Sequence, residues 1–515
     1  MQLWLCSLLA LLHSLRYQLS ESLIGVIQQA SATASSYAPH VLVFPFPAQS
    51  HVNAAMDLSR KLALLGVSVT FVCTEAYISS MLKQGFDAGG LPIRLHGMPD
   101  GLPKEKSLSD TLDQLDVLIR VTESMGPALQ ELLNQLNRTA ETRVSCVVYD
   151  FMLWWVGPLG KELNIPAYIS YPMSASFYSY LLHMPGFVSQ GRLPLGTHTD
   201  LSDGSNIFKL PGLPALHVSE VPDISWDPNS VCSFDYVLRC AVRCGDATGV
   251  LLNTVYELEK EAVEGLKNMR PELDIKTVGP TLPASFLKGE MNSSGGSSAH
   301  ESAEAQRCMK WLDEQPEASV LYVAFGTIAC LSEAQAQELA MGLEASKERF
   351  LWVVRIPGQQ QQKGLMSEQV QLLPSGFEER TKGRGMVLLE MAPQRKILVH
   401  PAIGGFLTHG GWNSTLEALC KGMPMLYYPM FADQGMNGKW VEEVLHAGKL
   451  LKRSGDGGIV SREEVERMVR EVITPTSPLR ATASRMKEVA SHAALDPAGS
   501  SSKNLYAFVE TLFPH

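Results

Sequence analysis

The segment from residue 405 to residue 423 combines the parts of an anion-binding site. The apolar residues 405–408 predict a short buried strand, and residues 409–411, His-Gly-Gly, follow as a turn that needs the backbone freedom of glycine. A helix is predicted to begin next, because Asn413 and Ser414 are good N-cap residues and Glu417 lies three places after Ser414. Free backbone N–H groups and the positive end of the helix dipole would point at the turn, so a phosphate is the expected ligand.

A purely structural interpretation fits the same residues. In that interpretation, Glu417 only caps the helix and His409 only packs in the turn. The helix pattern alone does not separate the two interpretations.

His51 is a candidate general base near the start of the chain. The apolar run 40–44 predicts a strand, residues 52–65 have a helical pattern, and residues 67–72 predict the next strand. In such a strand–helix–strand unit, the loop after the first strand lies at the sheet edge where open α/β proteins bind ligands. An imidazole can take up a proton there, because its ordinary pKa of about 6.5 leaves it largely neutral at cytosolic pH. A capping or packing role for His51 is the alternative.

Asp150 is a second candidate at the end of a strand. Residues 144–149 predict a buried strand, and Asp150 follows at its carboxyl end, before a helical stretch that carries Trp154 and Trp155. An aspartate that caps the following helix has the same pattern. The long separation between Asp150 and His51 means that only a fold can show whether they meet.

The elements that must position these residues belong to a large globular chain. Its 515 residues are enough for two or three domains, and 45% hydrophobic with 19% charged residues is a globular rather than a disordered composition. The formal net charge is −10, so the chain lacks the excess of basic residues that binds phosphate backbones. Nucleic acid is therefore not an expected partner.

The cysteines and the N-terminal residues indicate the cellular compartment in which the protein is expected. The nine cysteines include no CxxC pair and no His/Cys cluster at metal spacing, so neither a zinc site nor a disulfide framework is predicted, and a reducing compartment is favoured. The apolar run 1–12 has no preceding Lys or Arg and is too short to span a bilayer. Residues 1–38 are interpreted either as a dispensable, disordered extension or as a targeting segment. A glycosylation sequon, 413–415, lies inside the expected phosphate site and favours the cytoplasm.

Two segments resemble a known enzyme family. The stretch 391–434, MAPQRKILVHPAIGGFLTHGGWNSTLEALCKGMPMLYYPMFADQ, closely resembles the signature box of plant family 1 UDP-sugar glycosyltransferases at its Ala-Pro-Gln, His-x-Gly-Trp-Asn-Ser, Glu and Asp-Gln positions. The stretch 45–63, PFPAQSHVNAAMDLSRKLA, resembles the opening segment of the same family. With weaker matches elsewhere, the resemblance covers about residues 39–515.

The resemblance implies an α/β, GT-B-like fold, in which two doubly wound Rossmann-like domains with parallel sheets face each other. It places an acceptor-binding domain at 39–275, a linker and flexible loop at 276–305, and a UDP-sugar-binding domain at 306–485. C-terminal helices at 486–515 are expected to pack back on the N-terminal domain. Phe177, Tyr178, Tyr180 and Met184 are expected either to pack in the core or to wall an apolar acceptor pocket.

The resemblance also implies a role for each matching residue. His51 is the expected general base, and Asp150 is expected to hold its tautomer and stabilise the imidazolium. The expected donor contacts are Met391, Ala392 and Gln394 with uracil, Thr327, His409, Trp412, Asn413 and Ser414 with the diphosphate, Glu417 with the ribose, and Asp433 and Gln434 with the sugar. A closing glutamine is the family's usual mark of a glucose donor.

The chain departs from the family pattern at a few positions. Met391 replaces the tryptophan on which uracil usually stacks, and a thioether offers less flat area. We expect donor binding to be weakened by about 1–2 kcal/mol, which a Met391→Trp variant would reveal in the donor's binding constant. Gly410 replaces a common cysteine, and Ser50 replaces a common glycine.

The reaction that the resemblance implies is inverting transfer of glucose from UDP-glucose to a hydroxyl of a small apolar acceptor, such as a phenol, flavonoid, terpenoid or hormone of plant secondary metabolism. The resemblance implies a hexosyltransferase with no cofactor beyond its UDP-sugar co-substrate and no metal, in which helix N-termini and His409 neutralise the diphosphate. We expect a cytoplasmic monomer with no stable membrane span. The alternatives are another UDP-sugar donor or a non-catalytic UDP-sugar-binding protein. A Rossmann dehydrogenase is disfavoured, because no G-x-G-x-x-G follows a predicted strand.

Overall fold

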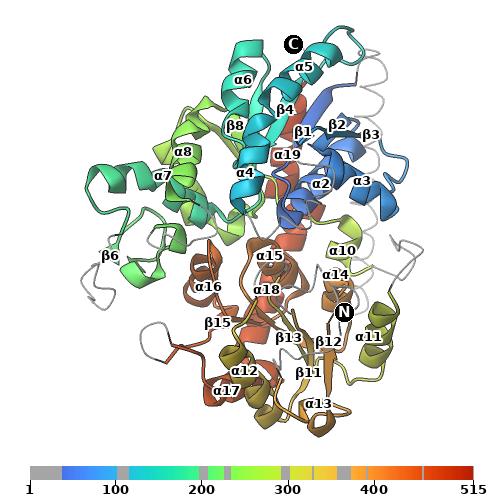
Figure 1. Ribbon diagram of the computed structural model, residues 1–515, viewed down its shortest axis with the longest axis vertical. Coiled ribbons are helices and arrows are strands. Elements are labelled where there is room, and N and C mark those ends of the chain that lie inside the picture. Colours follow the sequence, from blue (N-terminus) through green and yellow to red (C-terminus); the bar gives the residue numbers. More distant parts are fainter. Residues whose placement is uncertain are drawn as a thin grey trace, which may run out of the picture.

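The computed structural model describes residues 38–100, 115–195, 207–225, 233–290, 302–326, 330–355, 373–389, 392–454 and 458–513. Two α/β halves follow one another along the chain, each built on its own parallel sheet (Figure 1). Figure 1 shows the first half above, in blue to green, and the second below, in yellow to red. Residues 1–37 of the expected extension, the donor residues Thr327 and Met391, and residues 291–301 of the expected linker lie outside the described residues.

The first sheet has seven strands, all parallel, in the order β3-β2-β1-β4-β5-β8-β9. The central strands are mostly apolar, which suits a sheet that helices cover on both faces, whereas the two edge strands carry polar and charged residues. In spatial order the strands are β3 (Ile93–Met98), β2 (Ser68–Thr74), β1 (His40–Phe44), β4 (Cys146–Asp150), β5 (Ala167–Tyr171), β8 (Gly249–Leu252) and β9 (Asp274–Thr277).

Helices, two short strands and 3₁₀ turns complete the first half. The helices are α2 (Gln49–Leu64), α3 (Glu75–Lys83), α4 (Leu115–Ser124), α5 (Gly126–Leu136), α6 (Val156–Leu163), α7 (Ala175–Ser189), α8 (Phe234–Arg243), α9 (Lys260–Met269) and α10 (Ala284–Lys288). An antiparallel pair, β6 (Ile207–Phe208) and β7 (Leu216–His217), precedes the turns η2 (Val218–Glu220) and η3 (Asp223–Ser225), and η4 (Cys244–Asp246) and η5 (Tyr256–Leu258) follow later.

The second sheet has six strands, all parallel, in the order β12-β11-β10-β13-β14-β15. In spatial order they are β12 (Gly385–Leu388), β11 (Arg349–Val353), β10 (Val320–Ala324), β13 (Ile403–Thr408), β14 (Met425–Tyr427) and β15 (Gly448–Leu450). The helices around them are α11 (Ala303–Asp313), α12 (Glu333–Ser346), α13 (Phe377–Arg380), α14 (Gln394–Val399), α15 (Trp412–Lys421), α16 (Gln434–Glu443) and α17 (Arg462–Ile473). The expected α/β class with two parallel sheets is confirmed.

Both sheets reverse their strand order at a point that suits ligand binding. The order reverses between β1 and β4 in the first sheet and between β10 and β13 in the second. In open α/β sheets, ligands bind beyond the carboxyl ends of the strands at such a point. His51 follows β1 and Asp150 ends β4, whereas His409 follows β13, so the sequence places the candidate residues at both reversal points.

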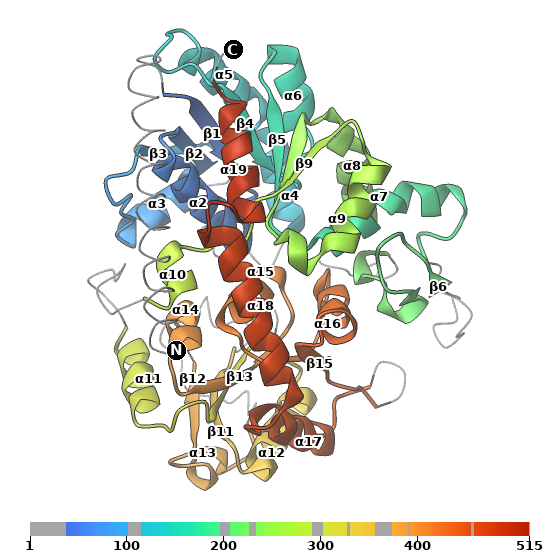
Figure 2. The same ribbon diagram turned by 180° about the vertical axis from the view of Figure 1, so that it is seen from behind.

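The last two helices return the chain to the first half. α18 (Pro478–Leu495) packs against α15, and α19 (Ser500–Glu510) packs against β9, so the pair runs along the back of both halves (Figure 2). The ring of Phe508 meets the ring of Tyr168 edge-on at 4.9 Å between centroids. Asn504 Nδ2 donates to the carbonyl of Thr277 at 2.9 Å. The exact limits of the expected domains stay a prediction.

Candidate active site

A cleft of about 950 Å³ lies between the two halves. Residues from the carboxyl-end loops of both sheets line it, as the two reversal points lead one to expect. It brings together most of the residues singled out in the sequence. Those that line the cleft are His51, Ala392, Gln394, His409, Trp412, Asn413, Ser414, Glu417, Asp433 and Gln434.

His51 and Asp150 form a hydrogen-bonded pair at the wall of the cleft. His51 lies in the first turn of α2, and its Nδ1 is 2.8 Å from Oδ2 of Asp150. The other carboxylate oxygen of Asp150 accepts from the backbone N–H of Met152 at 2.9 Å, which fixes the orientation of the carboxylate. Asp150 therefore contacts His51 rather than capping a helix, and Nε2 is left to receive a proton.

Asp150 is buried, whereas the side chain of His51 is 17% exposed, and the carboxylate changes the basicity of the histidine. Burial lowers the pKa of His51, but the charge of Asp150 and its hydrogen bond outweigh burial, with a further contribution from Asp433, so the pKa is raised above its ordinary value. The imidazolium form is therefore stabilised at the position where a general base would form it.

The turn after β13 has the strand–turn–helix arrangement of an anion site. Gly410 has a φ of +92°, and a Cβ on Gly326, after β10, would lie 2.8 Å from the ring of His409. The predicted helix start at Asn413 or Ser414, with Glu417 completing the cap, is wrong. Helix α15 already begins at Trp412, and its N-cap residue, Gly411, has no side-chain cap. Asn413 and Ser414 consequently lie in the first turn of the helix and line the cleft.

His409 is a candidate phosphate ligand, and its part in neutralising a diphosphate stays a prediction. Burial lowers the pKa of His409 to about 4, so its imidazole is neutral at physiological pH. It can offer an N–H to a phosphate oxygen, while the positive potential comes from the N-terminus of α15.

Trp412 and Asn413 join the turn to the first half. The indole Nε1 of Trp412 donates to the backbone carbonyl of Asn253 at 2.8 Å. Asn413 Nδ2 donates to the backbone carbonyl of Ser50 at 2.8 Å, directly before His51. The anion site and the candidate base are thus held in fixed relation across the cleft.

Glu417 accepts hydrogen bonds from Gln394, which the sequence analysis named, and from Arg395, which it did not. Gln394 Nε2 lies 2.7 Å from Oε2 of Glu417 and 2.9 Å from Oγ of Ser414. Arg395 Nε donates to Oε1 of Glu417 at 2.7 Å, and Arg395 Nη2 donates to Oδ2 of Asp57 at 2.6 Å. Spacing could not reveal the contact with Asp57, because that residue comes from the first half. Glu417 is not merely a helix-capping residue.

Asp433 and Gln434 lie at the start of α16. Asn437 Nδ2 donates to Asp433 Oδ2 at 2.7 Å and to the carbonyl of Gly410 at 2.9 Å. Burial raises the pKa of Asp433 to about 6. The side-chain oxygen of Gln434 accepts from the backbone N–H of Met430 at 2.8 Å, which leaves its amide N–H groups for a ligand. Asn437 was not predicted, although it lies one helical turn after Asp433.

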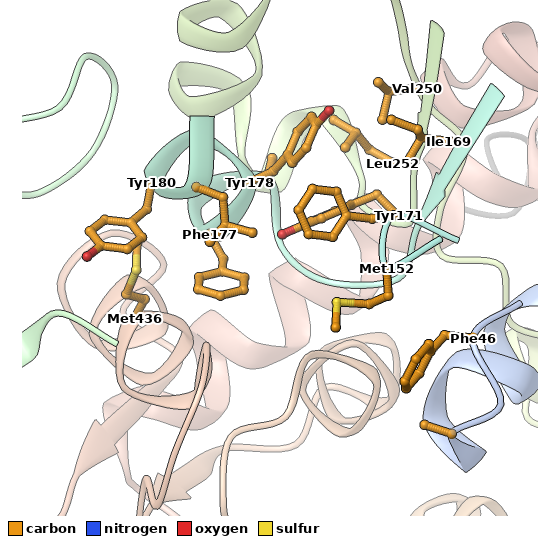
Figure 3. Close-up of a cluster of buried hydrophobic side chains, with 14 of the residues drawn as sticks. Phe46, Met152, Ile169, Tyr171, Phe177, Tyr178, Tyr180, Val250, Leu252 and Met436 are labelled. Atoms are coloured by element: carbon orange, nitrogen blue, oxygen red, sulfur yellow. The ribbon is translucent and has the colours of Figure 1, made fainter. Parts of the chain in front are cut away.

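An apolar wall closes the other end of the cleft. It consists of Phe46, Phe151, Met152, Pro172, Met173, Phe177, Leu181, Ile224, Val237 and Phe431. Figure 3 shows that Phe46, Met152 and Phe177 come from three separate segments. Of the four candidates for an acceptor wall, Phe177 lines the cleft, whereas Tyr178, Tyr180 and Met184 are buried in the core.

The described residues contain no group of three or more His, Cys, Asp or Glu side chains that could hold a metal ion. Among the helices of these same ranges, none is long and apolar enough to cross a membrane.

The chain matches known proteins over most of its length. A family model described as UDP-glucoronosyl and UDP-glucosyl transferase matches residues 40–478. Mogroside I-E synthase from Siraitia grosvenorii is 33% identical over 92% of this chain and 98% of its own, and 7-deoxyloganetin glucosyltransferase from Gardenia jasminoides is 33% identical over 92% and 97%.

Solved structures have the same architecture. Phytolacca americana UGT2 complexed with UDP-2fluoro-glucose and pterostilbene superposes with a TM-score of 0.74 at 27% identity, covering 92% of this chain and all of that one. A UGT transferase from Siraitia grosvenorii in complex with UDP gives a TM-score of 0.75 at 25% identity, over 92% and 99% of the two chains.

Proposed function

Because the chain belongs to the UDP-glucoronosyl and UDP-glucosyl transferase family, we propose that it transfers glucose from UDP-glucose, with inversion, to a hydroxyl of a small apolar acceptor. The observation that carries this proposal is the His51–Asp150 pair, which lies at the wall of the cleft that also contains Asp433, Gln434 and the N-terminus of α15. A base, groups that can hold a sugar and an anion site are thus present together.

The proposed reaction is a single displacement. Nε2 of His51 takes the proton of the acceptor hydroxyl while the oxygen attacks the anomeric carbon from the face opposite the diphosphate. The bond between that carbon and the phosphate oxygen breaks, and UDP leaves with the electron pair toward the N-terminus of α15. Asp150 stabilises the imidazolium that forms, as the orienting acid does in a catalytic triad.

The donor contacts follow from the residues that line the cleft. Glu417 accepts hydrogen bonds from the ribose hydroxyls, and Asp433 and Gln434 hold the hydroxyls of the sugar. The backbone N–H groups at the start of α15, with Ser414 and His409, hold the diphosphate. The burial of the Glu417 and Asp433 carboxylates supports these contacts, because burial strengthens hydrogen bonds to charged groups.

We also propose that the enzyme acts in the cytoplasm as a monomer. Asn413 belongs to a glycosylation sequon, and its Nδ2 donates to the carbonyl of Ser50. A glycan would be attached to that same nitrogen, so modification would break the contact beside the candidate base.

An acceptor and donor panel tests the function. Phenols, flavonoids, terpenoid alcohols and hormone alcohols are each incubated with UDP-glucose, UDP-galactose and UDP-glucuronic acid, and products are read by mass. We expect a product heavier by one hexose with UDP-glucose, and a β linkage in its NMR spectrum. Product with another donor alone would reassign the sugar, and UDP binding with no product from any pair would favour a non-catalytic UDP-sugar-binding protein.

A further inference from the structure

Arg395 joins two buried carboxylates that come from opposite halves of the protein. Its Nε donates to Oε1 of Glu417 on α15, and its Nη2 donates to Oδ2 of Asp57 on α2. The side chains of Asp57 and Glu417 are only 4% and 7% exposed, and that of Arg395 is 27% exposed. Buried ion pairs of this kind are costly to break on one side, because a charge is then left without compensation.

Glu417 is held at both of its oxygens. Arg395 occupies one hydrogen-bonding position on Oε1, and Nε2 of Gln394, at 2.7 Å, occupies one on Oε2. A carboxylate oxygen can accept two hydrogen bonds, so each oxygen keeps a position for a hydroxyl. The two donors therefore fix the plane of the carboxylate without using up its capacity to bind a ligand.

Asp57 connects this contact to the helix of the candidate base. Asp57 and His51 both lie on α2, which spans Gln49–Leu64. Asp57 has a second cation nearby, since Nη1 of Arg60 is 4.0 Å from its Oδ1, but Arg395 is the residue that reaches across the cleft. The guanidinium group of Arg395 thus ties Glu417 to α2, in addition to the contact of Asn413 with the carbonyl of Ser50 on the same helix.

We propose that Arg395 is a positioning residue, which orients Glu417 toward the ribose of the donor and links that contact to α2. The inference rests on the proposed ribose contact of Glu417. A guanidinium suits this role because its planar fork can serve two carboxylates at once, which an ammonium group does with less geometric control. Loss of Arg395 removes one of the two donors that fix the carboxylate of Glu417, so that the carboxylate can turn away from the ribose about its remaining contact with Gln394.

Comparison of UDP with 2′-deoxy-UDP isolates the contribution of the ribose hydroxyl. Binding of both nucleotides to the full-length protein is measured by calorimetry, for the unmodified protein and for Arg395→Leu and Arg395→Lys. We expect the unmodified protein to prefer UDP by roughly tenfold or more, as for a hydrogen bond to a charged group. Arg395→Leu is expected to reduce this preference to about threefold or less, mainly because the protein binds UDP more weakly. The preference of Arg395→Lys should lie between those of Arg395→Leu and the unmodified protein.

Arg380→Leu is the matched control. Arg380 forms a two-point pair with Glu344, at 2.8 and 3.0 Å, in the same half but outside the cleft lining. Its loss should leave the preference for UDP unchanged. Asp57→Asn removes the charge that anchors Arg395 while the arginine remains, and it should reduce the preference part of the way.

The possible outcomes distinguish a failure of the role of Arg395 from a failure of the proposed ribose contact of Glu417. An unchanged preference in Arg395→Leu, or equal weakening of both nucleotides, would overturn the role of Arg395 while the proposed function stands. If the unmodified protein binds both nucleotides equally, the ribose contact of Glu417 fails, and the role of Arg395 fails with it. Arg395→Lys keeps a cation between the carboxylates, so it provides the test if Arg395→Leu does not fold.

Discussion

The proposed donor end of the cleft, which comprises its polar lining from residues 394–434, and the apolar wall are built in opposite ways. At the donor end, Gln394 donates to Glu417 and Asn437 donates to Asp433, each over 2.7 Å, so polar side chains hold one another in pairs. The apolar wall comes from separate segments, including Phe46, Met152 and Phe177, and depends on shape rather than on paired polar groups. Under the proposed function, directional hydrogen bonds would recognise a constant nucleotide, whereas apolar area would select a variable acceptor.

The His51–Asp150 pair lies where the two ends meet. His51 is in contact with Phe46 of the apolar wall, edge-on at 5.7 Å between ring centroids, and it interacts electrostatically with Asp433 of the donor end. Variants of the pair should therefore slow the reaction with every donor and acceptor. Variants at the donor end should affect only the UDP-sugar, and variants of the apolar wall should affect only the acceptor.

The largest effect is expected for Asp150→Asn. This change removes the charge that stabilises the imidazolium of His51 but keeps a side chain of similar size. We expect kcat to fall by roughly 10²–10⁴-fold, the range of general acid–base contributions, with the Kd of UDP unchanged. A loss below tenfold in steady-state transfer assays would contradict a role of Asp150 in the chemistry.

The pH dependence of kcat/KM should show the raised pKa of His51. A base must be neutral to accept a proton, so the rate should fall about tenfold per pH unit below a midpoint that lies above 6.5. In Asp150→Asn, burial remains while the carboxylate charge is lost, so the midpoint should move to lower pH. A midpoint below 6.5 in the unmodified enzyme would contradict this account.

Acceptors with a carboxylate should be poorer substrates than matched alcohols. Asp223 accepts a hydrogen bond from the N–H of Ala432 at 2.6 Å, beside Asp433, and both carboxylates line the cleft. The cations among the described residues that line the cleft are Arg60, Arg395 and Lys396, and the first two of these have Asp57 as a partner. We expect 2-phenylethanol to exceed phenylacetate by roughly tenfold or more in kcat/KM, because like charges repel in a partly desolvated site.

An Asp223→Asn variant provides the control for this comparison. It should narrow the difference between the alcohol and the acid, with little change for the alcohol. Equal use of both substrates by the unmodified enzyme would show that the acidic side chains do not select the acceptor.

The smallest effect is expected at the apolar wall. Phe177→Ala removes an aromatic side chain that lines the cleft, so it should raise the KM of an apolar acceptor by about tenfold while the KM of UDP-glucose stays unchanged. Tyr180→Phe, in the core next to Ser225, serves as a control that should leave both KM values near their original levels. If Phe177→Ala raised only the KM of UDP-glucose, the distinction between the donor end and the apolar wall would be contradicted.

The sequence predicted the residues of the proposed donor end more fully than those of the apolar wall. The turn 409–411 and Glu417 lie close together in sequence, so a strand–turn–helix pattern could predict an anion site. The predicted start of the helix was wrong, because the glycine turn leads into α15 before Asn413. Contacts between distant segments, such as Arg395 with Asp57, depend on how the halves face each other, and no periodicity encodes them.

The central claim is that the cleft separates donor binding from proton transfer at His51. The most direct test is His51→Ala, with UDP binding measured by calorimetry and glucose transfer measured by product mass on the same preparation. The account predicts a Kd for UDP within about twofold of the unmodified protein and a loss of transfer of at least about 10²-fold. Transfer at the original rate would contradict it.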